Sequence, residues 1–341
     1  MGGPQTTAVQ RIGLYGKILP HELGYTWFSK KNFKTITDDG RVIDDVAVKD
    51  VPAHLIASTR FAWYVQRCDD AGCGEHGTGR TIERIDRKDQ TVTILSTGEK
   101  EIAFAQAYAA QLYWGTFGPY GATGELKHVV DGGGPVDTLW TGKGVQAVLI
   151  NAGVAYVADD ESVSAVPLFQ KGTPTKLATG LTEARGLAAD DTYVYVADRG
   201  EPAGNARASG FILRVPRTGG TVEKLAGPLK WPTVVAADKD RIYFMGDGSG
   251  DVWARPKAGG AASVFIPTPP GDWTCRSTAW LHVNERGLQY LRKSKGWDSV
   301  THEIIDWGTL WSIQRSWMTD PVKQLADYFA KGSAAGGGSR N

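Results

Sequence analysis

A pattern of residues that recurs along the chain limits its fold more than any other feature of the sequence. The clearest copy reads Gly-Leu-Ala-Ala-Asp-Asp-Thr-Tyr-Val-Tyr-Val-Ala-Asp from Gly186 and continues with Leu-Arg-Val-Pro-Arg-Thr-Gly-Gly from Leu213. The next copy reads Val-Val-Ala-Ala-Asp-Lys-Asp-Arg-Ile-Tyr-Phe-Met from Val234 and continues with Trp-Ala-Arg-Pro-Lys-Ala-Gly-Gly from Trp253. Both copies contain Pro, a basic residue, a variable residue and Gly-Gly in this order. We therefore interpret the chain as an array of similar structural units.

Further copies follow the same frame, and each contains an aromatic residue that anchors the pattern. The segment from His54 to Val65 aligns with the segment from Gly186 without a gap. The anchors lie roughly 36 to 50 residues apart and are Trp27, Trp63, Tyr113, Tyr156, Tyr195, Tyr243 and Tyr290. That spacing is typical of one four-stranded sheet per copy.

Each copy reads as four short strands separated by turns. Small apolar residues come first, a turn rich in Asp, Asn and Gly follows, and an aromatic, β-branched strand comes next. The pairs Gly219-Gly220 and Gly259-Gly260 are expected to turn into the fourth strand with positive φ. Radial stacking would bury both faces of such sheets, so we predict an all-β fold, a β-propeller of four-stranded blades. Seven blades are favoured, and six follow instead if the N-terminal copy around Trp27 is not a true blade.

The two ends of the chain are expected to meet in one blade. Residues 11–15 form a candidate strand that would complete the blade containing Tyr290. We predict a single propeller domain over residues 1–318. Residues 319–332 predict a short C-terminal helix, because Pro321 stands near its start and Gly332 near its end. Residues 333–341 predict a flexible Gly/Ser-rich tail.

The charge balance and the cysteines limit the partners and the compartment. The 341 residues carry 38 Lys and Arg against 37 Asp and Glu, so nucleic acid is a poor candidate partner. No apolar run is long enough for a transmembrane segment, and the first residues do not resemble a signal peptide. Cys68 and Cys73 flank a short loop and are a disulfide candidate, the alternative being two reduced thiols. A disulfide implies an oxidising compartment, so an extracellular or periplasmic location is favoured.

Three short motifs resemble a known group of repeat proteins. Leu-Tyr-Trp-Gly-Thr from Leu112, Ile-Tyr-Phe from Ile242 and Val-Pro-Arg-Thr-Gly-Gly from Val215 resemble bacterial propellers of the YWTD, streptogramin-lyase-like and NHL-type groups. The resemblance covers roughly residues 18–310, and no copy holds an intact Tyr-Trp-Thr-Asp. It implies the propeller architecture. It does not imply one activity, because such groups include binding modules, lyases and lactone hydrolases.

Function is expected in the long loops of one face. Turns between second and third strands share that face with the connections between blades, and four long insertions fall there: residues 66–80, 115–124, 199–210 and 292–300. The connections at 227–233 and 267–275 join them. The predicted binding residues combine aromatic side chains with carboxylates and are Trp231, Trp273, Trp297, Phe117, Tyr120, Glu201 and Asp198. They suit a protein, peptide or glycan ligand, whereas the alternative is that the aromatic residues pack loop bases and the acids are solvated.

A catalytic centre has two candidate bases and no metal motif. His54 begins an innermost strand and His76 lies in the longest loop, so either could serve as a general base in the central funnel. A structural histidine is the alternative for His54. Residues 247–251 resemble a calcium loop but lack the bidentate Glu, and we interpret them as a turn between second and third strands. We predict no cofactor, with Ca²⁺ on central carboxylates as the alternative.

Three functions are compatible with the sequence. We favour a secreted or surface-type, non-catalytic binding module that recognises a protein, peptide or glycan through its loop-rich face. The first alternative is a lyase or lactonase-like enzyme that acts in the central funnel with a divalent metal ion. The second is a structural or assembly subunit, because the tryptophans after residue 273 and the terminal helix could form a partner surface. The sequence does not indicate an oligomeric state.

Overall fold

The computed structural model describes most of the chain between residues 12 and 318, and every regular element among the described residues is a β-strand. The described residues are 12–13, 18–21, 24–28, 32–37, 42–47, 53–68, 79–116, 123–169, 172–200, 209–246, 250–267, 277–284, 287–298, 303–314 and 318. Within these ranges no helix is long and apolar enough to cross a membrane. The helix predicted over residues 319–332 lies outside them.

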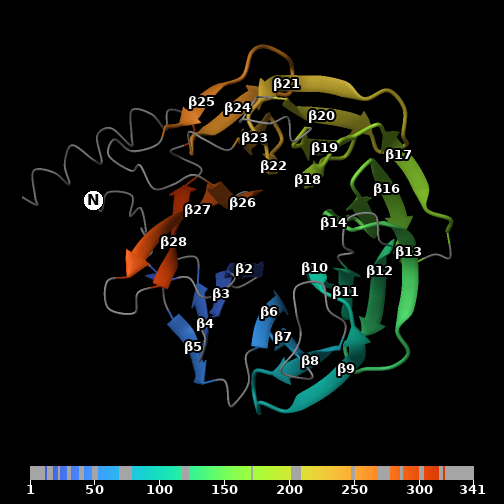
Figure 1. Ribbon diagram of the computed structural model, residues 1–341, viewed down its shortest axis with the longest axis vertical. Coiled ribbons are helices and arrows are strands. Elements are labelled where there is room, and N and C mark those ends of the chain that lie inside the picture. The colour runs from blue at the N-terminus through green and yellow to red at the C-terminus, as the bar shows by residue number, and fades with distance from the viewer. Residues whose placement is uncertain are drawn as a thin grey trace, which may run out of the picture.

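The strands form seven four-stranded antiparallel sheets, which Figure 1 shows arranged around a central axis. We call each sheet a blade. Blade 1 contains β2 (Ile18–His21), β3 (Gly24–Phe28), β4 (Asn32–Thr37) and β5 (Val42–Ala47). Blade 2 contains β6 (Ala53–Ser58), β7 (Ala62–Cys68), β8 (Arg80–Asp86) and β9 (Val92–Glu99). Blade 3 contains β10 (Ile102–Tyr108), β11 (Gln111–Thr116), β12 (Thr123–Val130) and β13 (Asp137–Lys143). Blade 4 contains β14 (Ala147–Asn151), β15 (Val154–Ala158), β16 (Ser162–Pro167) and β17 (Thr175–Thr179).

The remaining strands continue the ring in chain order. Blade 5 contains β18 (Ala184–Ala189), β19 (Tyr193–Asp198), β20 (Gly210–Pro216) and β21 (Glu223–Leu229). Blade 6 contains β22 (Val234–Ala237), β23 (Arg241–Met245), β24 (Val252–Pro256) and β25 (Ser263–Ile266). Blade 7 contains β26 (Ser277–Asn284), β27 (Gly287–Asp298), β28 (Glu303–Gln314) and β1 (Ile12–Gly13).

The hydrophobic core lies between neighbouring blades. One cluster joins Tyr156 and Leu177 of blade 4 to Val194 and Leu213 of blade 5, and all four side chains are buried. The first strand of each blade is innermost in Figure 1, and from blade 1 to blade 7 each first strand contacts that of the next blade, as β18 contacts β22. The sheets of blades 2 to 6 are therefore covered on both faces by their neighbours. The predicted all-β propeller fold is confirmed.

The ring is closed by strands from both ends of the chain. β1 is the outermost strand of blade 7, where Ile12 pairs with Gly308 and Gly13 pairs with Trp307. The other three strands of that blade come from residues 277–314 and include Tyr290. The predicted closing strand within residues 11–15 is confirmed.

The tight turns follow the chemistry of their residues. Asp190, after the first strand of blade 5, accepts hydrogen bonds from the backbone N–H groups of Thr192 and Tyr193 at 2.9 and 2.8 Å. Gly219 and Gly220 turn from the third strand into the fourth with φ values of +81° and +134°, as predicted.

The structure moves the anchoring aromatic residue of blade 2 by one position. A β-bulge between Leu55 and Ala57 adds a residue to β6. Tyr64 therefore lies opposite Ala57, just as Tyr195 lies opposite Ala188 in blade 5. The gapless alignment was wrong, and the anchor of blade 2 is Tyr64 instead of Trp63.

Blade 1 has no aromatic residue at the anchor position. Thr26 pairs with Leu19, which lies two residues before His21, the last residue of β2. In blade 5, Ala188 is the partner of the anchor Tyr195 and likewise lies two residues before Asp190. Thr26 is fully buried, so Thr26 takes the place that the sequence pattern gave to Trp27. The aromatic signal is displaced by one residue here as well.

A contact between neighbouring blades recurs on the face that carries these tight turns. The residue directly after the third strand of one blade reaches the anchor region of the blade before it. Arg217 donates from Nε to the hydroxyl of Tyr156 at 2.5 Å. Lys257 donates to Asp190 at 2.5 Å, and the same carboxylate accepts the Tyr195 hydroxyl at 2.6 Å.

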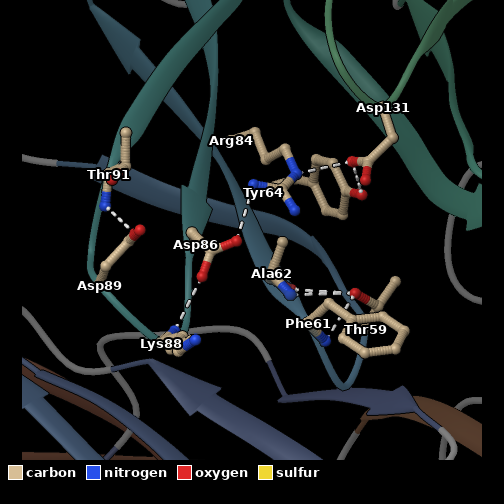
Figure 2. Close-up of polar contacts among 10 residues, drawn as sticks. All are labelled: Thr59, Phe61, Ala62, Tyr64, Arg84, Asp86, Lys88, Asp89, Thr91 and Asp131. Carbon is tan, nitrogen blue, oxygen red and sulfur yellow. Dashed lines mark hydrogen bonds and ion pairs between the residues drawn. The ribbon is translucent and has the colours of Figure 1, made fainter.

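Blades 1 to 3 use the same positions with different chemistry. Asp131 of blade 3 accepts the hydroxyl of Tyr64 at 2.5 Å and Nε of Arg84 at 2.8 Å, as Figure 2 shows. Arg87 of blade 2 donates from Nη2 to the hydroxyls of Thr26 at 3.0 Å and Ser58 at 2.7 Å. Contacts of this kind fasten blades 2, 3, 5 and 6 to the blade before each of them.

One predicted loop is instead an extended hairpin. β27 runs to Asp298 and pairs along its whole length with β28, so Trp297 lies opposite Ile304 within the ladder. The prediction of a loop was wrong for residues 292–298, and residues 299–300 lie outside the described residues.

Candidate functional site

The candidate site lies at the junction of blades 5 and 6, on the loop-rich face. We use this name for the face that carries the turns between second and third strands and the connections between blades. Residues 230–233 connect β21 to β22 there. Two glycines of blade 5 make room for them: a Cβ on Gly210 would lie 2.4 Å from Pro232, and one on Gly186 would lie 2.7 Å from the carbonyl oxygen of Thr233. The connection is therefore seated directly on the backbone of blade 5.

Trp231 in this connection has a strained backbone. Its φ is +46°, in the left-handed region that a bulky side chain rarely adopts. The other described non-glycine residues with positive φ all lie in tight turns of the opposite face and are Gln90, Ala109, Ala110 and Ala152. Hairpin geometry accounts for those four, but not for Trp231. Strain of this kind persists where the surroundings enforce it, and it concentrates at functional positions.

Two cationic side chains approach the partly exposed ring of Trp231. The guanidinium carbon of Arg199 lies 5.0 Å from the ring centroid, and the ammonium group of Lys230 lies 5.7 Å from it. Both distances fall within the range of a cation–π contact. Arg199 comes from the start of the turn after β19, so the side chain of blade 5 and the connection to blade 6 meet at this ring.

A single carboxylate holds two arginines beside the tryptophan. Glu183 Oε1 accepts hydrogen bonds from Nε of Arg185 at 2.8 Å and from Nη1 of Arg199 at 3.1 Å. The side chain of Glu183 is 12% exposed, whereas those of Arg185 and Arg199 are 31% and 33% exposed. Each guanidinium has five N–H donors, so the contacts to Glu183 occupy only part of their capacity.

Asp198 supports the site from beneath. It is 6% exposed, and its carboxylate accepts the backbone N–H groups of Glu183 at 2.9 Å and Thr182 at 3.1 Å. These bonds fix the segment that precedes β18 and thereby the position of the Glu183 side chain.

The side chains of this cluster favour an anionic ligand. Arg185, Arg199 and Lys230 supply three positive charges, against the two carboxylates of Glu183 and Asp198. Arginine can bind a carboxylate through two parallel N–H bonds, and tryptophan beside it offers a large apolar surface. The arrangement can therefore hold a carboxylate and an adjacent apolar group together.

The structure brings together two of the predicted binding residues, Trp231 and Asp198, at opposite ends of this network. Trp297 lies on β27 of another blade. The other predicted residues lie outside the described ranges: Trp273, Phe117, Tyr120, Glu201 and the candidate base His76. Cys68 ends β7, and Cys73 lies outside the described residues as well.

The second candidate base, His54, lies on β6, the innermost strand of blade 2, as predicted for its backbone. Among the described residues, no three His, Cys, Asp or Glu side chains are grouped so that they could hold a metal ion. Residues 247–249 of the predicted turn lie outside the described residues, between β23 and β24 in the chain. The Nδ1 atom of His128 lies 2.8 Å from Gln111 Oε1, and the His128 ring stacks on the ring of Tyr113. Both contacts hold His128 against its own blade.

Sequence reasoning missed Glu183, Arg185, Arg199 and Lys230. Glu183 precedes β18 and Arg185 lies within it, whereas Arg199 directly follows β19 and reaches Glu183 through the pairing of these two strands. The backbone N–H of Arg199 donates to the carbonyl oxygen of Glu183 at 2.9 Å. A short sequence motif does not reveal this contact, because the residues lie far apart in the chain and meet only when the sheet forms.

Comparisons with known proteins support the fold alone. No protein-family model and no curated protein matches the sequence. The WD40 domain of Neurospora crassa Pan2 is similar, with a TM-score of 0.57, 8% identity and coverage of 88% of this chain and 90% of that chain. An acylaminoacyl peptidase in complex with Z-Gly-Gly-Phe-chloromethyl ketone has a TM-score of 0.54 and 10% identity, with 83% of this chain and 51% of that chain covered.

A chain of a nidogen/laminin complex is a more distant match, with a TM-score of 0.46, 15% identity and coverage of 68% of this chain and 93% of that chain. WD40 domains are β-propellers, so the likeness to Pan2 agrees with the ring of blades. The fold and the comparisons together place this protein in the β-propeller class. The narrower resemblance to YWTD, streptogramin-lyase-like and NHL-type propellers stays a prediction.

Proposed function

We propose that the protein is a binding module that recognises a short acidic segment of a protein partner on the loop-rich face of blades 5 and 6. The strained, partly exposed Trp231 beside two cations is the observation that carries this proposal. Tryptophan and arginine are the residues most enriched at the centres of binding interfaces. A strained tryptophan in contact with an arginine is poorly explained by a need for stability alone.

The charges select the ligand class within the predicted set of protein, peptide and glycan. Arg199 already lies near the ring of Trp231, so a neutral sugar would have to compete with this cation for the aromatic surface. A peptide carboxylate would instead bind the guanidinium and leave the cation–π contact intact. An acidic peptide therefore fits the cluster better than a glycan.

Selection of binders tests this function directly. A phage-displayed random peptide library is selected on the intact protein, and the affinities of the enriched peptides are measured by fluorescence anisotropy. We expect enrichment of Asp and Glu, weaker binding as the salt concentration rises, and an affinity loss of about tenfold or more in W231A and in R199A.

A matched control is available on the same blade. Arg214 lies 4.5 Å from the ring centroid of Tyr193 and pairs with Glu223 at 2.7 Å, so it repeats the arginine–aromatic–glutamate arrangement away from the site. R214A should bind the selected peptides as the wild-type protein does. Equal losses in R214A and R199A, or enrichment of peptides without acidic residues, would refute the proposal.

A further inference from the structure

An apolar groove runs beside the candidate site, between blades 5 and 6. It has a volume of about 300 Å³. Residues 225–229 of β21 form one side, and Phe244, Trp253 and Ala262 of blade 6 form the other. The side chains that line it are apolar, and polar backbone groups also contribute to its surface. The volume is at the low end for a ligand pocket, so it suits a single large side chain better than a whole cofactor.

The groove exists because β21 does not pair regularly. Leu229 pairs with Gly210 and Ala226 pairs with Ile212, so two residues of β21 lie opposite one residue of β20. A second irregularity follows between Ile212 and Leu213. Bulges bend a strand away from a flat ladder. Small residues at the bend, Ala226 on β21 and Ala262 on the facing blade, leave the space unfilled.

The groove continues into the candidate site along the chain and has a basic residue at that end. Its lining ends at Leu229, and Lys230 and Trp231 follow directly in the chain. Within the described part of the chain, Lys230 forms no ion pair. Lys224, by contrast, lies on the other face of the blade 5 sheet, because its ammonium group is 3.9 Å from the ring centroid of Phe211, which packs toward blade 4. Positive charge therefore lies at the end of the groove that joins the candidate site.

We propose that this groove takes an apolar side chain of the same peptide, so that the ligand is an extended segment in which an acidic residue stands next to one apolar residue. This inference rests on the proposed function. The apolar side chain enters between the blades, and the neighbouring acidic residue binds the basic groups of Lys230 and Arg199. Continuity of the groove with this basic end selects an acidic segment over an uncharged one.

Two labelled peptides test the groove without altering the protein. The probes are fluorescein-labelled Asp-Glu-Leu-Glu-Asp and its analogue with Ala in place of Leu. We expect the leucine peptide to bind the wild-type protein about tenfold more tightly or better, because burial of the leucine side chain adds to the charge contacts.

A groove-filling variant completes the cycle. A262L should weaken binding of the leucine peptide to the level of the alanine peptide and leave the alanine peptide unchanged. The thermal midpoint of A262L confirms that the variant is folded. W231A should weaken both peptides by a similar factor, which separates the groove from the proposed function.

The outcomes are distinct. Equal binding of both peptides to the wild-type protein, or no effect of A262L on their ratio, overturns the groove while leaving Trp231-dependent binding in place. If A262L changes the molecular mass measured by light scattering, the groove belongs to a contact with a second copy of the chain, and the peptide proposal is overturned. A large gain in leucine-peptide affinity after removal of residues 319–341 would assign it to the chain's own C-terminal segment, with the same consequence.

Discussion

At the scale of single residues, partly buried polar side chains join neighbouring blades through hydrogen bonds. Asp190 is the clearest case, because its carboxylate accepts two backbone N–H groups, the Tyr195 hydroxyl and the ammonium group of Lys257. Burial on its own would raise the pKa of Asp190, but these hydrogen bonds outweigh it and lower the pKa to about 2. The same carboxylate and burial raise the pKa of Tyr195.

This pKa predicts how stability depends on pH. A carboxyl group whose pKa is lower in the folded state stabilises the protein above its unfolded pKa and loses this contribution as pH falls toward its folded pKa. D190N should therefore lower the free energy of unfolding by about 1 to 2 kcal/mol at neutral pH. The difference from the wild-type protein should shrink between about pH 4 and pH 2. Urea unfolding at several pH values measures it, and D191N, in the exposed neighbour of the same turn, is the control. A difference that is constant with pH would contradict the assignment.

Arg87 of blade 2 contacts blade 1, and its substitution is expected to cause the largest loss of stability among the single substitutions considered. Its guanidinium contacts the hydroxyls of Thr26, Thr35 and Ser58 and lies 4.6 Å from the ring centroid of Trp63. R87A would leave Thr26 and Thr35, which are fully buried, without this donor. We expect a loss of about 2 to 3 kcal/mol in the free energy of unfolding. K88A changes the exposed neighbour and should have little effect in the same chemical denaturation experiment.

At the scale of the elements, the anchors show why the repeat was visible in sequence and why its register was not. Tyr156, Tyr195 and Tyr243 were correctly identified, and they lie opposite Leu149, Ala188 and Ala236 on the first strands of their blades. The bulge in β6 shifts blade 2 by one residue, and neighbouring Trp63 and Tyr64 are both aromatic. A pattern of residue types cannot decide between two adjacent aromatics, whereas strand pairing can.

The closing strand offers a test at this scale. β1 is short and pairs only with β28, yet it completes the outer edge of blade 7. A chain that starts after residue 16 should melt several degrees lower than the full chain, because blade 7 then has an open outer edge. A chain that starts at residue 11 retains β1 and is the matched control. Equal thermal midpoints for the two shortened chains would show that β1 does not hold the ring closed.

At the scale of the whole molecule, ring closure couples all seven sheets. Blades 2 to 6 each pack against two neighbours, β1 joins the two ends of the chain in blade 7, and the contacts after the third strands add polar links between several blades. An open array of repeats can lose its terminal units first. A closed ring has no terminal unit, so local opening has to break contacts on both sides of a blade.

Closure therefore predicts one cooperative unfolding transition. Circular dichroism of the backbone and tryptophan fluorescence should give the same midpoint in urea for the full chain. Removal of residues 1–16 should separate the two curves, because most tryptophans lie in the C-terminal part of the chain and report on the opened blade. Coincident curves in the shortened chain would argue that cooperativity does not depend on closure.

The sequence by itself determined the repeat, the four-stranded unit and the strand that joins the two ends. These are encoded locally, because turn residues and strand-forming residues recur at a fixed spacing. Only the tertiary structure decided the candidate site and the groove beside it. The site joins Glu183, Arg199 and Trp231 across two strand pairings and a connection between blades, and the groove depends on bulges in β21. Contacts between distant residues follow from strand register and packing, and no short stretch of the sequence specifies either of them.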